Sequence, residues 1–223
     1  MQFLMKVADN DHHQYAETIS KMIEEAAKIR RTGIAKRNPE YIRQKIAEGK
    51  AVIALDNDKV IGFCYIESWE NKKYVANSGL IVHPDYRNTG LARTIKRAMF
   101  DLSKEKFPNA KLFGITTSLA VMKINSDLGY SPVTFSELTQ DEAFWKGCQT
   151  CVNYDILRRT NRTLCLCTGM VCDLSKVPGK NSEQNKQRSW EKFKRFMMLR
   201  RLRLKRKIKK FPLLKYSLKN EKQ

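Results

Sequence analysis

The stretch from Ala51 to Lys106 constrains the fold more than any other part of the chain. Three strand-like segments in it are separated only by short polar turns: Ala51–Leu55, Val60–Glu67 and Tyr74–Val82. Such turns join neighbouring antiparallel strands, so the pattern predicts a three-stranded meander. A short loop then leads into Leu91–Lys106, which has the apolar spacing of an amphipathic helix.

Further elements on both sides of the meander complete an α+β pattern. In chain order they are a strand at 2–8, helices at 9–31 and 38–48, a strand at 111–117, a helix at 118–128 and a last strand from Val133. This order predicts a mixed, mostly antiparallel central sheet flanked by helices.

The loop before the third helix has the chemistry of a phosphate site. It reads Arg87-Asn88-Thr89-Gly90-Leu91-Ala92 and lies between a predicted strand and a predicted helix. Backbone N–H groups at a helix N-terminus bind anions, and glycine permits close approach of a phosphate. The loop alone fits either a pyrophosphate site or an ordinary helix start.

Basic residues are concentrated at the C-terminal end. Residues 176–223 contain 18 Lys and Arg against 3 Asp and Glu, whereas residues 1–175 contain 25 against 20. We therefore divide the chain into a main domain at 1–139, last strands with a cysteine-rich element at 140–175, and a basic helical tail at 176–223. The tail could contact an anionic surface or another subunit, or remain a solvated extension.

The loop and the sequence before it, Val82-His83-Pro84-Asp85-Tyr86, resemble the coenzyme A loop of GNAT-superfamily N-acyltransferases. The element order is also similar to that fold over residues 1–139. The resemblance implies that amides from Asn88 to Ala92 hold the pyrophosphate and that the pantetheine arm follows strand 74–82. It further implies that a backbone N–H near Leu80, Ile81 or Val82 polarises the thioester carbonyl.

Three other stretches are similar to the acyltransferase domain of N-acetylglutamate synthases: residues 33–37, 111–118 and 129–133. This resemblance implies an enzyme of arginine biosynthesis that acylates the α-amine of glutamate. Lys36, Arg37, Thr117 and Ser118 are the candidate groups for the two carboxylates. Another amine acceptor stays open, and so does the donor, acetyl-CoA or succinyl-CoA.

Acyl transfer to an amine needs a base. Glu67, at the end of the third predicted strand, is the first choice, with Glu70 second. Ser78, beside Asn77 on the next strand, could hold a water. Many GNAT enzymes carry a tyrosine acid at a position that is Asn125 here, and an amide can only hydrogen-bond the leaving thiolate.

The cysteine-rich element has two cysteine pairs, Cys148 with Cys151 and Cys165 with Cys167. Four thiolates fit a structural zinc site, although the second pair is CxC and not CxxC. The other interpretation is a cluster of reduced cysteines, as expected for a cytoplasmic protein.

Two function classes remain. One is a small-molecule acyltransferase, alone or as a homo-oligomer. The other is a non-catalytic protein with the same fold that docks on nucleic acid or the ribosome through its basic tail. The sequence contains no apolar run long enough to cross a membrane.

Overall fold

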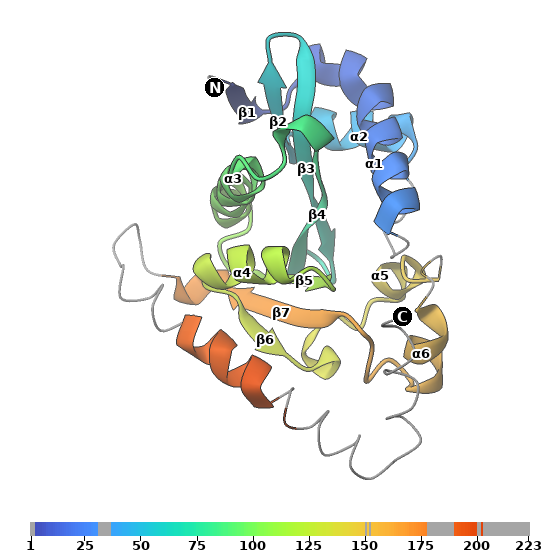
Figure 1. Ribbon diagram of the computed structural model, residues 1–223, viewed down its shortest axis with the longest axis vertical. Helices are drawn as coiled ribbons and strands as arrows, with labels where there is room; N and C mark the ends of the chain where they lie inside the picture. Colours follow the sequence, from blue (N-terminus) through green and yellow to red (C-terminus); the bar gives the residue numbers. More distant parts are fainter. Residues whose placement is uncertain are drawn as a thin grey trace, which may run out of the picture.

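The computed structural model describes residues 3–30, 37–149, 151, 153–177, 190–199 and 202. Seven strands form one sheet in the order β1-β2-β3-β4-β5-β7-β6 (Figure 1). Their bounds are β1 Leu4–Val7, β2 Ala51–Asp56, β3 Lys59–Trp69, β4 Tyr74–Val82, β5 Lys111–Thr116, β6 Ser131–Val133 and β7 Thr168–Asp173. Only β4 and β5 pair in parallel, which confirms the mixed, mostly antiparallel sheet.

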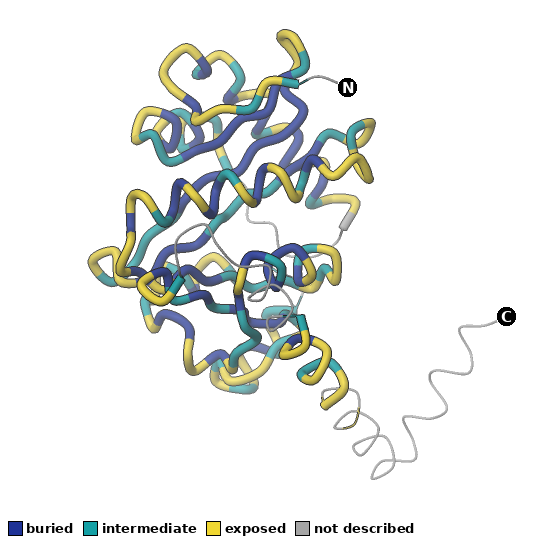
Figure 2. The backbone as a smooth tube through the Cα atoms, turned by 90° about the vertical axis from the view of Figure 1, so that its left-hand side faces the viewer, coloured by how far each residue is buried: buried dark blue, intermediate teal, exposed yellow. Residues whose placement is uncertain are grey.

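Helices cover both faces of the sheet. On one side lie α1 (Ala16–Arg30) and α2 (Pro39–Ala47), and on the other lie α3 (Leu91–Lys106) and α4 (Leu119–Asp127) (Figure 1). Alternate side chains of β2 pack against the helices on opposite faces of the sheet, so the protein has a hydrophobic core on each face. Its Val52 and Ala54 pack with α3, whereas its Ile53 packs with α1 and α2. The tube in Figure 2 shows the strands buried between helices with exposed outer faces.

Local signals explain where α2 and α4 begin. The Asn38 side chain accepts a hydrogen bond from the Tyr41 amide at 2.8 Å, and Pro39 occupies the first helical turn. Ser118 caps α4 by accepting from the Val121 amide at 3.4 Å. The start of α1 differs from the prediction, because residues 10–15 form a 3₁₀ turn that Asp9 caps.

The sheet opens between β4 and β5. Their parallel pairing ends at Ala76 and Phe113, after three residue pairs, while β4 continues to Val82. A bulge in β4 adds to the divergence, and Gly79 in it has a φ of 65°. A Cβ at Gly79 would lie 2.2 Å from Cε1 of Tyr65, so this position requires glycine.

Residues 140–167 contain two short helices that the sequence pattern does not predict. They are α5 (Glu142–Lys146) and α6 (Tyr154–Arg159), between β6 and β7. Aromatic contacts fix this insertion to the sheet, because the Phe144 ring lies 5.0 Å from that of Phe113 and 5.3 Å from that of Trp69. Single helical turns carry too little periodicity to be recognised from sequence.

The first described part of the basic tail packs on the main domain. Residues 190–199 are helical, and Phe193 is 3% exposed within the core that α3 and α4 share. The Trp190 ring stacks on Phe193 and lies 5.5 Å from the Lys123 ammonium of α4. This segment is therefore no solvated extension, whereas the linker at 178–182 and most of the tail lie outside the described residues.

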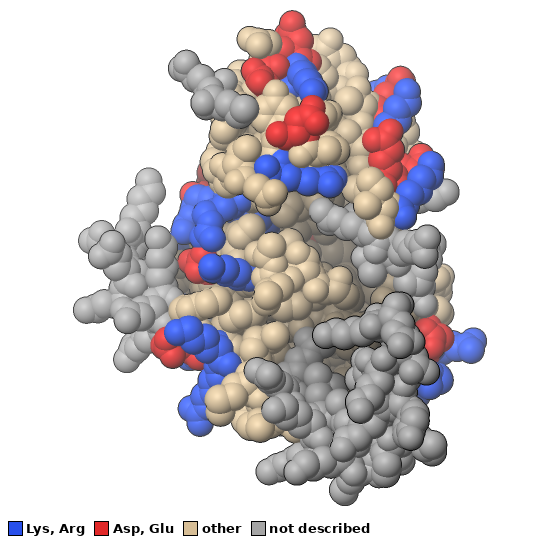
Figure 3. All heavy atoms as spheres, viewed as in Figure 1, with Lys and Arg blue, Asp and Glu red and all other residues tan. Residues whose placement is uncertain are grey.

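Charges of both signs are mixed over the surface of the described residues. On the face in Figure 3, Lys and Arg side chains lie beside Asp and Glu side chains on the helices. No helix among the described residues combines the length and the apolar character that crossing a bilayer requires.

Candidate active site

A cleft of about 1010 Å³ lies where β4 and β5 diverge. Its walls come from the loop before α3, from both strands, from α4 and from the N-terminal part of α2. One end therefore reaches the phosphate loop, and the other reaches the base candidate Glu67 together with Arg37 and Tyr41. Arg37 and Ser118, two residues of the predicted site that are 81 positions apart in the sequence, both line this single space.

The phosphate loop presents its backbone to the cleft. Asn88 and Gly90 have φ angles of 65° and 87°, which turn successive N–H groups toward one side. Among the described residues, no hydrogen bond engages the amides from Asn88 to Ala92, whereas those of Arg93 and Thr94 both donate to the Gly90 carbonyl. A Cβ at Gly90 would meet no protein atom within 4 Å, so the space beside the loop is open for an anion.

The predicted cofactor residues divide between two environments. Leu80, Val82, Arg87, Asn88, Gly90, Leu91 and Ala92 line the cleft. Ile81 is 2% exposed and packs with α1 and α2, because alternate side chains of β4 point to opposite faces. Thr89 uses its hydroxyl to donate to the Tyr86 carbonyl at 2.7 Å.

The end of the cleft opposite the loop combines a cation with aromatic rings. The Arg37 Nε donates to the Tyr65 hydroxyl at 2.5 Å, and the guanidinium lies 5.2 Å from the centre of the Tyr41 ring. Stacking and hydrogen bonding fix the guanidinium plane, which suits it for recognising a planar carboxylate. Lys36 lies outside the described residues.

Glu67 is a half-buried carboxyl at the same end. Its side chain is 15% exposed, and one carboxyl oxygen lies 3.0 Å from the Lys45 Nζ. Burial raises the pKa of Glu67 to about 7, opposed by the positive charge of Arg37. Burial also lowers the pKa of Lys45. A carboxyl that titrates near neutrality beside a substrate cleft has the properties of a general base.

Two other candidates on β4 and its turn have different surroundings. Ser78 lines the cleft beside Asn77, whose Oδ1 accepts from the Ser103 hydroxyl at 2.8 Å. Glu70 instead accepts from the Thr139 hydroxyl at 2.6 Å and the Gln140 amide at 3.0 Å. Glu70 therefore ties the β3–β4 turn to the insertion and leaves Glu67 as the carboxyl of the cleft.

Asn125 does not line the cleft. It is 3% exposed, and its amide NH₂ group faces the Met170 sulfur at 3.8 Å, behind Gly114. Ser118 lines the cleft but its hydroxyl caps α4. Thr117 is exposed and lines a second cavity. The α4 helix thus presents other residues to the cleft than the sequence indicates.

The second cavity, of about 520 Å³, brings the four predicted metal ligands together. Cys148, Cys151, Cys165 and Cys167 all line it and are all free thiols. Burial, followed by the neighbouring thiols Cys151 and Cys165, raises the pKa of Cys148 to about 11. Within the described ranges, however, no three His, Cys, Asp or Glu side chains are arranged to hold a metal ion.

Sequence reasoning missed several residues of the cleft region. Tyr41 and Lys45 share one face of α2, and the Lys45 ammonium lies 5.0 Å from the Tyr41 ring centre. Tyr65 and Lys96 were also missed, since neither belongs to a motif in the strand predicted at 60–67 or the helix predicted at 91–106. The available signal was a lysine next to apolar residues, Lys45 before Ile46 and Lys96 after Ile95, which marks a charge near the core.

The chain is similar to known acetyltransferases. Residues 20–121 match the acetyltransferase (GNAT) family. No curated protein sequence matches the chain significantly. A solved N-acetylglutamate synthase from Neisseria gonorrhoeae superposes with a TM-score of 0.55 at 14% identity, over 78% of this chain. The match spans 35% of that synthase, about a third of its length.

Two smaller proteins are covered almost completely. A Mycobacterium tuberculosis protein solved with CoA has a TM-score of 0.54 at 12% identity, over 76% of this chain and 98% of its own. A Salmonella typhimurium protein solved with its cofactor acetyl-CoA has a TM-score of 0.54 at 13% identity, over 82% of this chain and 99% of its own. At these identities the likeness establishes the fold. The family match assigns residues 20–121, a little under half of the chain, to the acetyltransferase (GNAT) family.

Proposed function

We propose that this enzyme transfers the acetyl group of acetyl-CoA directly to the α-amine of glutamate. One observation carries the proposal: a single cleft joins the open amides of the 88–92 loop to an end that holds Arg37 and Glu67. The loop fits the pyrophosphate of CoA, and the far end fits an acceptor with an amine and carboxylates.

The reaction follows from these groups. Glu67 takes a proton from the acceptor ammonium, directly or through a water held beside Ser78. The free amine attacks the thioester carbonyl, a C–N bond forms, and the C–S bond breaks as its electron pair moves to sulfur. A backbone N–H of β4 near Leu80 stabilises the carbonyl oxygen as its charge develops.

Recognition of glutamate rests on charge. Arg37 is held by Tyr65 and Tyr41 in an orientation that suits bidentate pairing with a carboxylate. A carboxylate of the acceptor would add a charge-assisted hydrogen bond to this cation, which a neutral acceptor cannot form. The shared fold of the Neisseria gonorrhoeae synthase, solved with CoA and N-acetyl-glutamate, also supports the choice. Lys36 and Ser118 are proposed as further contacts, and the pathway is proposed to be arginine biosynthesis.

The first test is a transfer assay with acetyl-CoA and succinyl-CoA against the common amino acids. We expect acetyl-CoA with glutamate to give the highest kcat/KM, well above glutamine, which has the same shape but one carboxylate fewer. Equal acylation of glutamine would contradict the glutamate assignment and leave acyl transfer standing. If coenzyme A does not raise the melting temperature at all, the non-catalytic binding protein is the better interpretation.

Variants at Arg37 test the acceptor end. Arg37→Met should raise the glutamate KM about tenfold or more, the order expected for a charged hydrogen bond, without changing CoA affinity. Tyr65→Phe is the matched control, because it removes the 2.5 Å hydrogen bond and keeps the ring and the guanidinium. It should have a smaller effect on KM. An Arg37→Met enzyme with unchanged glutamate KM would contradict the assignment.

We further propose a structural zinc ion held by Cys148, Cys151, Cys165 and Cys167. Their convergence on one cavity supports it, and thiolates are the ligands that zinc prefers. Binding would require the thiols to move closer and to lose their protons, since the described residues hold no ready metal cluster. Four thiolates leave no open position, so the ion would stabilise the insertion and take no part in catalysis.

A further inference from the structure

Lys96 is a buried lysine at the wall of the cleft. It lies in α3, is 4% exposed and lines the space between β4 and β5. Its ammonium is 5.3 Å from the centre of the Tyr130 ring, and no ion pair among the described residues includes it. Burying an ammonium without an anion is costly, so the position calls for an anionic partner.

The depth of Lys96 indicates which part of CoA it faces. It is six residues beyond Gly90, roughly 9 Å along the helix axis from the phosphate loop. On the sheet it neighbours the Cys64 thiol, which donates to the Ser78 carbonyl at 3.2 Å. Ser78 lies just past Ala76, where the pairing of β4 with β5 ends. Lys96 is therefore at the level where the strands separate, beyond the pyrophosphate.

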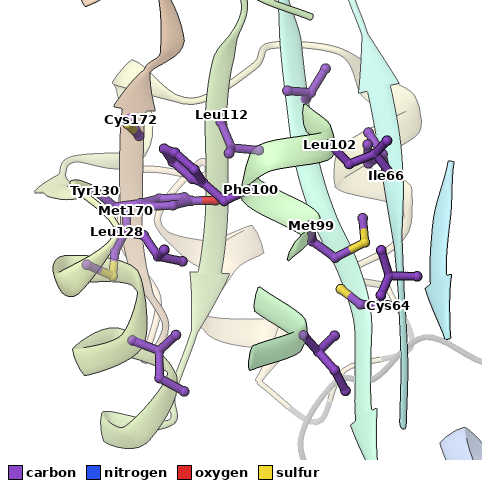
Figure 4. Packing of buried hydrophobic residues seen from close by; sticks show 14 of the residues in the cluster. Cys64, Ile66, Met99, Phe100, Leu102, Leu112, Leu128, Tyr130, Met170 and Cys172 are labelled. Carbon is purple, nitrogen blue, oxygen red and sulfur yellow. The ribbon is translucent and has the colours of Figure 1, made fainter. Parts of the chain in front are cut away.

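Among the described residues that line this part of the cleft, Lys96 is the side chain that could donate a proton. Figure 4 shows the Tyr130 ring beside Phe100 of α3, with Cys64 near Met99, so apolar side chains and a thiol pack around this part of the helix. Asn125 is turned to Met170 behind Gly114 and does not reach the cleft. Burial lowers the pKa of Lys96, which makes its proton easier to transfer.

We propose that Lys96 is a catalytic residue that stabilises and protonates the coenzyme A thiolate released by acyl transfer. The inference rests on the proposed function. As the C–S bond breaks, its electron pair stays on sulfur. The Lys96 ammonium pairs with this thiolate and gives it one proton, which leaves a neutral amine that regains a proton from water. The acceptor ammonium loses its first proton to Glu67 before attack, and the nitrogen of the new C–N bond loses its second proton to water.

The test compares CoA with desulfo-CoA, which lacks the sulfur. Above the thiol pKa, about 8.5 for a free thiol, wild type should bind CoA about tenfold or more tightly than desulfo-CoA. Lys96→Met should lose this preference, keep its desulfo-CoA affinity and lose about a hundredfold in kcat. Lys106→Met, the same substitution at an exposed position of α3, should behave as wild type.

Retained affinity for desulfo-CoA shows that the variant is folded. Ultraviolet absorbance of bound thiolate gives a second readout, because Lys96→Met should raise the pKa of the bound CoA thiol. The inference is overturned if the variant keeps the preference for CoA, if wild type shows none, or if mass spectrometry finds the acetyl group on Lys96. Failure of wild type to bind either compound would instead overturn the proposed function and this inference with it.

Discussion

The chemistry proposed for this protein depends on what burial does to single charged side chains. Burial removes water from Glu67, Lys45 and Lys96, which raises the pKa of the carboxyl and lowers the pKa of the two ammonium groups. Arg37 acquires its role differently, by being fixed against two tyrosine rings. Some of the neighbours come from elements that are distant in sequence, such as Tyr65 for Arg37 and Lys45 for Glu67.

Glu67 gives a prediction at this scale. Its pKa of about 7 means that the carboxylate, which can accept a proton, predominates only above that pH. The kcat should therefore be low at acidic pH, where Glu67 is protonated, and should rise as pH increases through about 7. Glu67→Gln should lower kcat about a hundredfold and remove this acidic limb. Steady-state kinetics against pH provide the measurement.

Glu70→Gln is the matched control for Glu67. Its oxygen can still accept from Thr139 and Gln140, so turnover and its pH dependence should stay near wild type. If Glu67→Gln keeps the wild-type pH profile, Glu67 is not the base.

At the scale of elements, two junctions build the cleft. The bulge at Gly79 and the short pairing of β4 with β5 open the sheet, and the loop from Asn88 to Gly90 directs free amides into the opening. Both depend on backbone conformations with positive φ, which glycine and asparagine tolerate. The α3 helix then continues from the loop and carries Lys96 to the cleft wall.

The helix at 190–199 gives a prediction about stability. Phe193 is 3% exposed, so Phe193→Ala should lower the free energy of unfolding by about 3 kcal/mol. Leu199→Ala, on the same helix but 46% exposed, should have little effect. Chemical denaturation of both variants checks this. We expect turnover per folded molecule to be unchanged in both variants, because no residue of 190–199 lines the cleft. Truncation of the chain near Ser175 should also leave it unchanged.

A large loss of turnover at a temperature where Phe193→Ala remains folded would contradict this separation. It would indicate that the tail helix supports the active site through α4, where Lys123 meets Trp190.

At the scale of the whole molecule, the insertion between β6 and β7 couples two cavities. Ser118 and Cys148 line both the cleft and the cysteine cavity, and Phe144 lies at the cleft wall. The two cavities therefore share part of a wall, which does not include Arg37 or Glu67. We therefore expect the proposed zinc ion to affect activity only through the stability of the insertion.

Elemental analysis of protein purified without chelator tests the zinc proposal. We expect one equivalent of zinc, and chelation should lower the melting temperature more than turnover at low temperature. Cys148→Ser should lose the metal, whereas Cys172→Ala, at a buried cysteine outside the cavity, should keep it. Less than about one-tenth of an equivalent of any metal would favour a cluster of reduced thiols.

The sequence by itself determined the order of the main elements from β1 to α4 and the position of the phosphate loop. β4 and α3 have the predicted bounds, because their apolar periodicity and turn residues are local properties. The same holds for the start of α2, where Asn38 and Pro39 act within one helical turn. Glu67 could be proposed for a similar reason, since a carboxylate at the end of a strand is visible in the sequence.

Only the tertiary structure decided which of the candidates share one space. Thr117 and Asn125 directly adjoin cleft residues in the sequence, yet Thr117 lines the second cavity and Asn125 faces Met170. Lys96 and Tyr65 line the cleft because the sheet opens beside them. Divergence of β4 from β5 depends on contacts across more than thirty residues of sequence, such as Ala76 with Phe113, and burial of a charge depends on all its neighbours at once. No local pattern records either property.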